Sequence, residues 1–436
     1  CGMSLDVISY AEAKKSRALA TALGQPAARS LAAKCAIGED AVVGFAGDST
    51  ADKPYEYLTM GMAAYIAQFP RMNANYYGWD GTSSYGTVVP ILTGITARSV
   101  LMRDDFDTDA ADLVGSTPTT GGGTWTNTGA GNGDWEVTGG ACVATADATP
   151  GYVTNTVGTG DGEFSTRVTL ANGDGLRFYI KWKDSNNYIR VILEQNASGQ
   201  CRITLGKCIA GTLTTLNGTE YFYNNTAVHT YDVTVRVVGT RVTASMNGQM
   251  IGGTLTSGDV SALSTADKIA ISGTNRGSAS IDFVEWASVT AESSPGTVTI
   301  YNGSKSGSVL TYQEGLIGTL FPSGVTFDTI IINSGHNYSA TTPADYQTAI
   351  DHFIGVLRTV QPTASIVIGS QNPRVSPATY IVEHAARCAS LAAYCARKGY
   401  GYIPTFEAFA QLKTVGSDLI TADGIHPTGQ MDGGSG

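Results

Sequence analysis

Hydrophobic residues follow two different patterns along the chain. Short and almost uninterrupted apolar runs occur at 41–46, 297–301, 329–333 and 365–369, and helix-like stretches at about 343–360 and 377–397 follow the last two. Such runs predict parallel strands that are buried on both faces by helices. Between about 104 and 289 apolar and polar residues alternate instead, as in 188–193, 231–237 and 241–248, with Gly, Asn and Asp between the segments. That alternation predicts many short strands of a β-sandwich.

The order of these patterns predicts one α/β domain that is interrupted by an all-β domain. The α/β pattern stops near residue 103 and resumes at 297, directly after the linker-like segment Ser293–Gly296. We therefore divide the chain into a helical N-terminal arm (1–40), the first part of the α/β domain (41–103), an inserted β-sandwich (104–290) and the second part of the α/β domain (291–436). The arm is rich in Ala, Lys and Arg.

Composition excludes several classes of partner. The net charge is −10 and the chain has no cluster of basic residues, which argues against binding to nucleic acid. No run of about 18 apolar residues is present, so we expect no membrane span. The seven cysteines show no CxxC spacing, so the sequence predicts no zinc site. A neutral or weakly charged substrate fits this composition best.

Candidate chemistry lies directly after predicted strands, where substrates bind in parallel α/β sheets. Ser49 follows the first apolar run in Gly47-Asp48-Ser49, and we expect a helix from Pro54 whose N-terminus helps to stabilise an anion at the serine. Gly307 follows the run 297–301, and a glycine there lets a backbone N–H approach a ligand. Asn337 follows the run 329–333, and its amide can donate to an oxyanion.

A carboxylate and an imidazole lie close together near the end of the chain. In Asp423-Gly424-Ile425-His426, the acid can hold one imidazole nitrogen while the other faces a serine hydroxyl. Each candidate also has an ordinary structural explanation. These explanations are an N-cap for Ser49, a turn for Gly307, an Asx-turn for Asn337 and a structural histidine for His426.

Taken together, these blocks resemble those of the SGNH (GDSL-like) hydrolases, in the same order along the chain. The resemblance covers about 41–100 and 296–430 and implies a flavodoxin-like three-layer α/β/α fold. It also implies that Ser49 is the nucleophile, His426 the general base and Asp423 its orienting partner. The backbone N–H groups of Ser49 and Gly307 and the side chain of Asn337 would form the oxyanion hole. Tyr338 departs from the family, which often has Asp at that position. No metal or organic cofactor is implied.

The inserted segment resembles concanavalin-like, laminin-G-type jelly rolls, which often bind carbohydrate. The resemblance rests on segments such as Asp104-Asp105-Phe106, Gly123-Thr124-Trp125, Trp135–Gly140 and Trp182–Ile189. Its tryptophans, Trp125, Trp135, Trp182 and Trp286, can either stack on sugar rings or fill the sandwich core. The turn Asp184–Asn187 is either a calcium ligand set or a solvated turn.

Together, the two resemblances predict an esterase that removes O-acetyl groups from a polysaccharide through an acyl-enzyme intermediate. The start Met3-Ser4-Leu5-Asp6, followed by the Ala/Lys-rich arm, resembles bacteriophage tail proteins, which implies an extracellular or virion-associated protein acting on a bacterial surface glycan. Two alternatives stay open. One is a secreted esterase or lipase for small or lipid esters, and the other is a non-catalytic glycan- or receptor-binding protein on an SGNH scaffold. The oligomeric state does not follow from the sequence.

Overall fold

The described part of the chain forms two compact units. The computed structural model describes residues 29–54, 56–128, 135–144, 152–218, 228–275, 279–374 and 380–413. The α/β unit comprises the described residues up to Val88 together with those from Ser294 onward, and the β unit comprises Val89–Ser293.

A parallel sheet forms the centre of the α/β unit. The six strands that the α/β unit contributes lie in the order β23-β22-β21-β1-β20-β2, and every neighbouring pair among them is parallel. The expected apolar runs correspond to β1 (Ala41–Gly47), β20 (Gly296–Asn302), β21 (Thr329–Asn333) and β22 (Ser365–Gly369). The sheet also contains β2 (Met72–Gly78), which the sequence did not predict, and β23 (Gly401–Ile403). Since the strands are parallel, their carboxyl ends meet at one edge.

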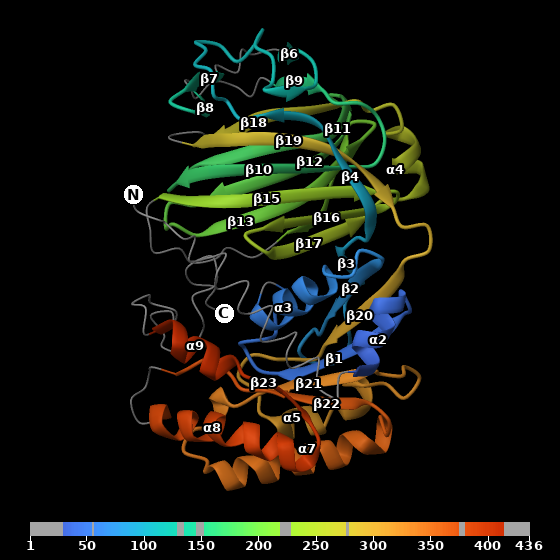
Figure 1. The fold of residues 1–436 in the computed structure, drawn as a ribbon, viewed down its shortest axis with the longest axis vertical. Helices are drawn as coiled ribbons and strands as arrows, with labels where there is room; N and C mark the ends of the chain where they lie inside the picture. The colour runs from blue at the N-terminus through green and yellow to red at the C-terminus, as the bar shows by residue number, and fades with distance from the viewer. Residues whose placement is uncertain are drawn as a thin grey trace. The chain divides into compact units, whose positions relative to one another are not determined.

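Helices cover both faces of this sheet (Figure 1). One face packs against α5, α7 and α8 through a core that includes Ile330, Ile332, Phe353 and Leu357. The other face packs against α2 and α3. The helices are α2 (Arg29–Ile37), α3 (Tyr57–Ile66), α5 (Leu310–Glu314), α6 (Ile317–Leu320), the 3-10 turn η2 (His336–Tyr338), α7 (Pro343–Val360), α8 (Ile381–Lys398) and α9 (Thr405–Lys413).

Local sequence signals explain the long helices. At the start of α7, Thr342 accepts a hydrogen bond from the backbone N–H of Asp345 (3.2 Å) and Pro343 takes the first turn, where no N–H is needed. Gly399 ends α8 in a left-handed conformation (φ 72°). Among the described residues, no helix combines the length and the apolar character needed to cross a bilayer.

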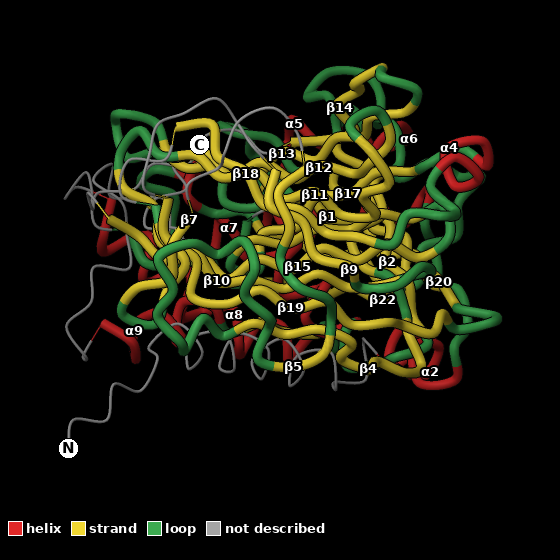
Figure 2. The backbone as a smooth tube through the Cα atoms, turned by 90° about the horizontal axis from the view of Figure 1, so that it is seen from above, coloured by secondary structure: helices red, strands yellow, loops and turns green. Residues whose placement is uncertain are grey.

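The β unit consists of two antiparallel sheets, and strands dominate it (Figure 2). The first sheet has the order β17-β16-β15-β10-β19-β4-β5 with β7 and β8 attached, and the second has the order β14-β13-β12-β11-β18-β9-β6. The two-sheet arrangement is consistent with the expected jelly roll. Phe164 of β10 and Phe178 of β11 contact each other between the sheets, with ring centroids 5.1 Å apart.

The strands of the β unit differ widely in length, from two residues in β5 to twelve in β19. The elements of the unit are β3 (Val89–Leu92), β4 (Ile95–Asp104), β5 (Thr120–Gly121), β6 (Thr126–Thr128), β7 (Trp135–Thr138), β8 (Ala141–Ala144), β9 (Tyr152–Thr156), β10 (Gly162–Ala171), β11 (Gly175–Asp184), β12 (Asn187–Gln195), β13 (Cys201–Ile209), β14 (Thr212–Gly218), β15 (Val228–Val238), β16 (Arg241–Met246), β17 (Gln249–Thr254), α4 (Ser257–Ala262), β18 (Lys268–Asn275) and β19 (Ser280–Ala291).

The β unit begins earlier in the sequence than the expected residue 104. Strand β4 pairs with β19 along most of its length, for example Arg103 with Glu285 and Ser99 with Ser288. Most β4 side chains are exposed, so the strand lacks the alternation of buried and exposed residues that would reveal it in the sequence. Pairing with a strand almost 190 residues away therefore places it in the β unit.

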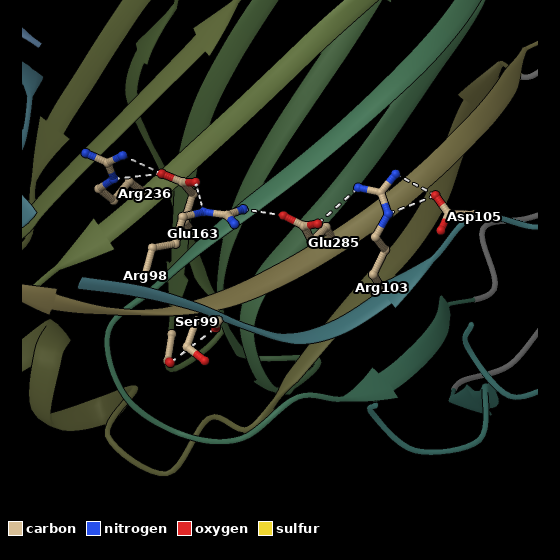
Figure 3. A network of polar contacts seen from close by, with 8 residues as sticks. Arg98, Ser99, Arg103, Asp105, Glu163, Arg236 and Glu285 are labelled. Atoms are coloured by element: carbon tan, nitrogen blue, oxygen red, sulfur yellow. Dashed lines mark hydrogen bonds and ion pairs between the residues drawn. The ribbon is translucent and has the colours of Figure 1, made fainter. Parts of the chain in front are cut away.

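A row of alternating charges crosses the first sheet (Figure 3). Glu163 accepts hydrogen bonds from Arg236 (2.8 Å) and Arg98 (2.7 Å). Arg98 also binds Glu285, which accepts a second bond from Arg103 (3.0 Å). Burial opposes ionisation of Glu285, but the hydrogen bonds from both arginines outweigh it and hold its pKa below the ordinary value. The side chains of this row therefore connect the four strands β15, β10, β4 and β19 to one another.

The contact between Gly162 and Trp286 predicts a sensitive position in the β unit. A Cβ added to Gly162 would overlap the buried indole ring of Trp286. We expect Gly162→Ala to lower the free energy of unfolding of the β unit by about 1–3 kcal/mol, since overpacking forces neighbouring groups to move. Denaturant unfolding followed by circular dichroism measures this change.

Gly258→Ala in α4 is the matched control. A Cβ there meets only Thr256 Oγ1 at 3.6 Å, an ordinary contact. Because alanine favours helix, this variant should be neutral or more stable. Equal destabilisation by both substitutions would contradict the packing argument.

Candidate functional site

The segment that carries Ser49 leaves the carboxyl end of β1 in a tight turn. The backbone N–H of Ala51 donates to the carbonyl of Asp48 (3.1 Å), and Ser49 between them is 7 % exposed. At Gly47 a Cβ would lie 2.7 Å from the carbonyl oxygen of Asn333 and 2.8 Å from Ser304 Oγ. Only glycine permits this close approach, which draws the loops after β1, β20 and β21 together.

The helix expected directly after Ser49 begins later than predicted. Helix α3 starts at Tyr57 with Glu56 as its N-cap, not at Pro54. Ser49 is therefore not a helix N-cap, and the expectation that the helix N-terminus stabilises an anion at Ser49 is wrong. The described residues between β1 and α3, 48–54 and Glu56, form a loop that we call the β1 loop.

Gly307 lies in the loop of residues 303–309, the β20 loop, which is bonded to the β1 loop. The backbone N–H of Lys305 and the hydroxyl of Ser308 both donate to the carbonyl of Gly47 (3.1 Å each). The N–H of Ser306 donates to Asp52 Oδ2 (2.9 Å). Gly307 itself is exposed, has φ 73°, and nothing lies within 4 Å of a Cβ added to it. This left-handed conformation favours glycine and leaves open space beside its backbone.

Asn337 lies in η2, within the loop of residues 334–342 that follows β21, the β21 loop. Its Nδ2 donates to the carbonyl of Ser308 (2.9 Å), so this amide connects the β21 loop with the β20 loop. An amide has two N–H donors, and this bond uses one of them and fixes the orientation of the group. Arg387 of α8 stabilises the same loop by donating hydrogen bonds to the carbonyls of Ser339 and Thr341 (2.9 Å each) and Gly335 (3.2 Å).

Three of the five predicted site residues therefore lie in loops that are bonded to one another. The loops follow β1, β20 and β21, and β1 pairs with both of the other strands. Asp423 and His426 lie outside the described residues, so their part in the site stays a prediction. Backbone N–H groups and side-chain amides are the kinds of donor that can stabilise a negatively charged oxygen.

Two buried residues that the sequence did not single out support the β1 loop. Oδ1 of Asp48 accepts hydrogen bonds from the N–H (3.2 Å) and hydroxyl (3.0 Å) of Thr50 and from Nε2 of Gln371 (2.8 Å). Gln371 follows β22. Because ligands bind at the carboxyl ends of parallel strands, the position of Gln371 after this strand was a signal in the sequence that could have identified it. The hydroxyl of Tyr57 also donates to Asn333 Oδ1 (2.7 Å).

Burial controls the protonation of Asp48. The carboxyl group is fully buried, and its desolvation raises the pKa more than the hydrogen bonds from Gln371 and Thr50 lower it. The pKa of Asp48 therefore lies above its ordinary value. The pKa of Tyr57 is also raised, first by burial and then by the nearby Asp48.

The tryptophans of the β unit belong to its interior. Trp125, Trp135, Trp182 and Trp286 are at most 2 % exposed. They are core residues and do not present a ring to a sugar at the surface. In the turn after β11, Asp184 accepts hydrogen bonds from the N–H of Asn186 (2.8 Å) and from Asn187 Nδ2 (3.0 Å), so its carboxylate stabilises the turn. The described residues contain no group of three or more His, Cys, Asp or Glu arranged to hold a metal.

The chain matches no protein-family model and no curated protein. Among solved structures it is similar to a peptidoglycan O-acetylesterase, with 11% identity and a TM-score of 0.33 over 93% of this chain and 91% of the other. It is also similar to the carbohydrate-binding module CBM66 from Bacillus subtilis (13% identity, TM-score 0.28, 43% of this chain and 100% of the module). A third is the CBM2 module of the evolved Dit of Lactobacillus casei BL23 phage J-1 (11% identity, TM-score 0.31, 45% of this chain and 97% of the module). These values are too low to assign the chain to any of the three groups.

The raised pKa of Asp48 predicts a pH dependence of stability. Because the folded-state pKa exceeds the unfolded value of about 3.9, the contribution of Asp48 is full below that value and is lost as pH rises through the folded pKa. Asn cannot ionise and keeps an acceptor oxygen. The free energy of unfolding of Asp48→Asn, relative to wild type, should therefore increase as pH rises from about 4 towards neutrality.

Denaturant unfolding at several pH values measures this difference. Other titrating groups are the same in both proteins and cancel in the comparison. A difference that stays constant with pH would show that the protonation of Asp48 is not linked to folding.

Proposed function

We propose that the chain is a serine ester hydrolase of the SGNH type. The observation that carries the proposal is the hydrogen-bonded convergence of the loops with Ser49, Gly307 and Asn337 at the carboxyl edge of a parallel sheet. The strand order supports it as well. When β2, which lies beyond β20, is left out of the numbering, β20-β1-β21-β22-β23 has the order 2-1-3-4-5 of flavodoxin-like sheets.

In the proposed reaction, Ser49 Oγ attacks the ester carbonyl. His426, which Asp423 orients, takes the proton of the Ser49 hydroxyl in the same step. The tetrahedral oxyanion accepts hydrogen bonds from the N–H groups of Ser49 and Gly307 and from the side chain of Asn337. When the intermediate collapses, His426 returns the proton to the departing alcohol and an acyl-serine remains. A water molecule, deprotonated by His426, then releases the acid and restores Ser49.

We propose O-acetylated polysaccharide of a bacterial surface as the substrate class and a virion-associated or extracellular setting. The acidic net charge fits a neutral substrate better than a polyanion. The β unit has its own core and a broad polar sheet face, so it can present a surface to an extended polymer without taking part in the chemistry. Its buried tryptophans imply that hydrogen-bonding groups, rather than these rings, would make such contacts.

Ser49→Ala should abolish hydrolysis of p-nitrophenyl acetate and release of acetate from a panel of O-acetylated polysaccharides. The side chain is small, so its truncation removes the nucleophile and leaves little cavity. Ser323→Ala, at an exposed position before β21, is the control and should keep full activity. Activity of Ser49→Ala within about tenfold of wild type would remove Ser49 from the mechanism.

Replacing residues 89–293 by a short Gly/Ser linker should leave hydrolysis of small esters largely intact and weaken activity on polymers. The predicted catalytic residues all lie outside the β unit, whereas a bound polymer would have a higher effective concentration at Ser49. The thermal transition of the variant must first show that it folds. An equal fractional loss on p-nitrophenyl acetate and on polysaccharide would mean that the β unit supports the active site and does not bind substrate.

A further inference from the structure

Gln371 occupies a buried position between two loops of the proposed site. It follows β22 at the carboxyl edge of the parallel sheet and is 1 % exposed. Its Nε2 donates to Asp48 Oδ1 (2.8 Å), Thr50 Oγ1 (2.9 Å) and the carbonyl of Asn333 (3.2 Å). Its Oε1 accepts from the backbone N–H of His336 (2.6 Å). One side-chain amide thus connects the β1 loop with the β21 loop.

The partners of Gln371 are the neighbours of the proposed catalytic groups. Asp48 and Thr50 flank Ser49 on both sides, and His336 directly precedes Asn337. We infer that Gln371 is a positioning residue that sets the placement of the nucleophile Ser49 relative to the oxyanion donor Asn337. This inference rests on the proposed function, because it concerns the same site.

An amide is the side chain that these contacts require. Asp48 and the carbonyl of Asn333 need a donor, while the N–H of His336 needs an acceptor, and one amide provides both. These groups are buried, so water would not replace the hydrogen bonds that Gln371 makes to them. Gly335 permits the contact, since a Cβ there would lie 3.0 Å from Gln371 Oε1.

The loss of this amide should affect the chemical step more than substrate binding. Small errors in the placement of a nucleophile or an oxyanion donor reduce the rate steeply, and a displacement of about 1 Å costs on the order of 10²-fold. Gln371 does not itself need to touch the substrate. We therefore expect Gln371→Met, which keeps the side-chain length and removes the hydrogen bonds, to lower kcat by roughly 10- to 100-fold with a smaller change in KM.

Gln361 offers a matched control in the same unit. It is 4 % exposed, and its Nε2 donates to the carbonyls of Phe321 (3.2 Å), Pro322 (3.0 Å) and Val325 (2.9 Å). Its Oε1 accepts from the N–H of Phe327 (3.4 Å). These partners lie before β21, at the opposite end of that strand from the site. Gln361→Met should lower the melting temperature as Gln371→Met does and leave kcat near wild type.

The test measures kcat, KM and melting temperature on p-nitrophenyl acetate for wild type, Gln371→Met, Gln361→Met, Asn337→Ala and the double variant Gln371→Met/Asn337→Ala. If Gln371 acts by positioning Ser49 and Asn337, the two single losses in kcat should not multiply in the double variant. Equal kcat for the two Met variants, or full multiplication in the double variant, would overturn the inference.

Gln371→Glu provides a second variant in case Gln371→Met does not fold. A protonated carboxyl group keeps one donor and one acceptor, whereas an ionised one would face Asp48 without a donor. Its kcat relative to wild type should therefore rise as pH falls, and a ratio independent of pH would also overturn the inference. Ser49→Ala in the same assay keeps the two claims separate. If Ser49→Ala is active, the proposed function fails; if it is inactive while both Gln371 variants behave as wild type, only the inference fails.

Discussion

The pairing of β1 with β20 on one side and β21 on the other is the constraint on which the site depends. It places the carboxyl ends of three strands at one edge of the sheet, so that loops distant in the sequence can form hydrogen bonds with one another. Gly47 allows the three loops to approach closely, and its carbonyl is an acceptor for Lys305, Ser308 and Gln313. The side chains of Asn337 and Gln371 then complete a network in which each loop is held by its neighbours.

The sequence predicted most of the central sheet because its strands are buried on both faces. A strand such as β21, Thr329–Asn333, has no solvent-facing position and so forms an apolar run that needs no alignment to detect. Strand β2 was missed because Asn73 and Asn75 interrupt its apolar residues. It becomes part of the sheet through pairing with β20, whose residues lie more than 200 positions further along the chain.

The site was predictable in part for a related reason. The sequence singled out Ser49, Gly307 and Asn337 because they follow recognisable strands and form a known order of motifs, and the structure shows that their loops are hydrogen-bonded to one another, while their catalytic roles stay predictions. Gln371 belongs to no such motif, and only its contacts reveal that it joins two loops. The tryptophans were ambiguous because a strand residue has the same sequence signature on either face of a sheet, and packing decides which face is covered. For Asp423 and His426 the sequence alone supports the assignment.

The position of β20 between β1 and β2 has a consequence for how the protein folds during synthesis. The first two strands leave the ribosome without their common neighbour, and the whole β unit is made before β20 follows. Contacts such as that between Ser306 and Asp52 span 254 residues, so the site can assemble only after most of the chain exists. Because contacts of such long range form slowly, β1 and β2 stay without their partner β20 until the β unit has been made, and unpaired strands favour aggregation.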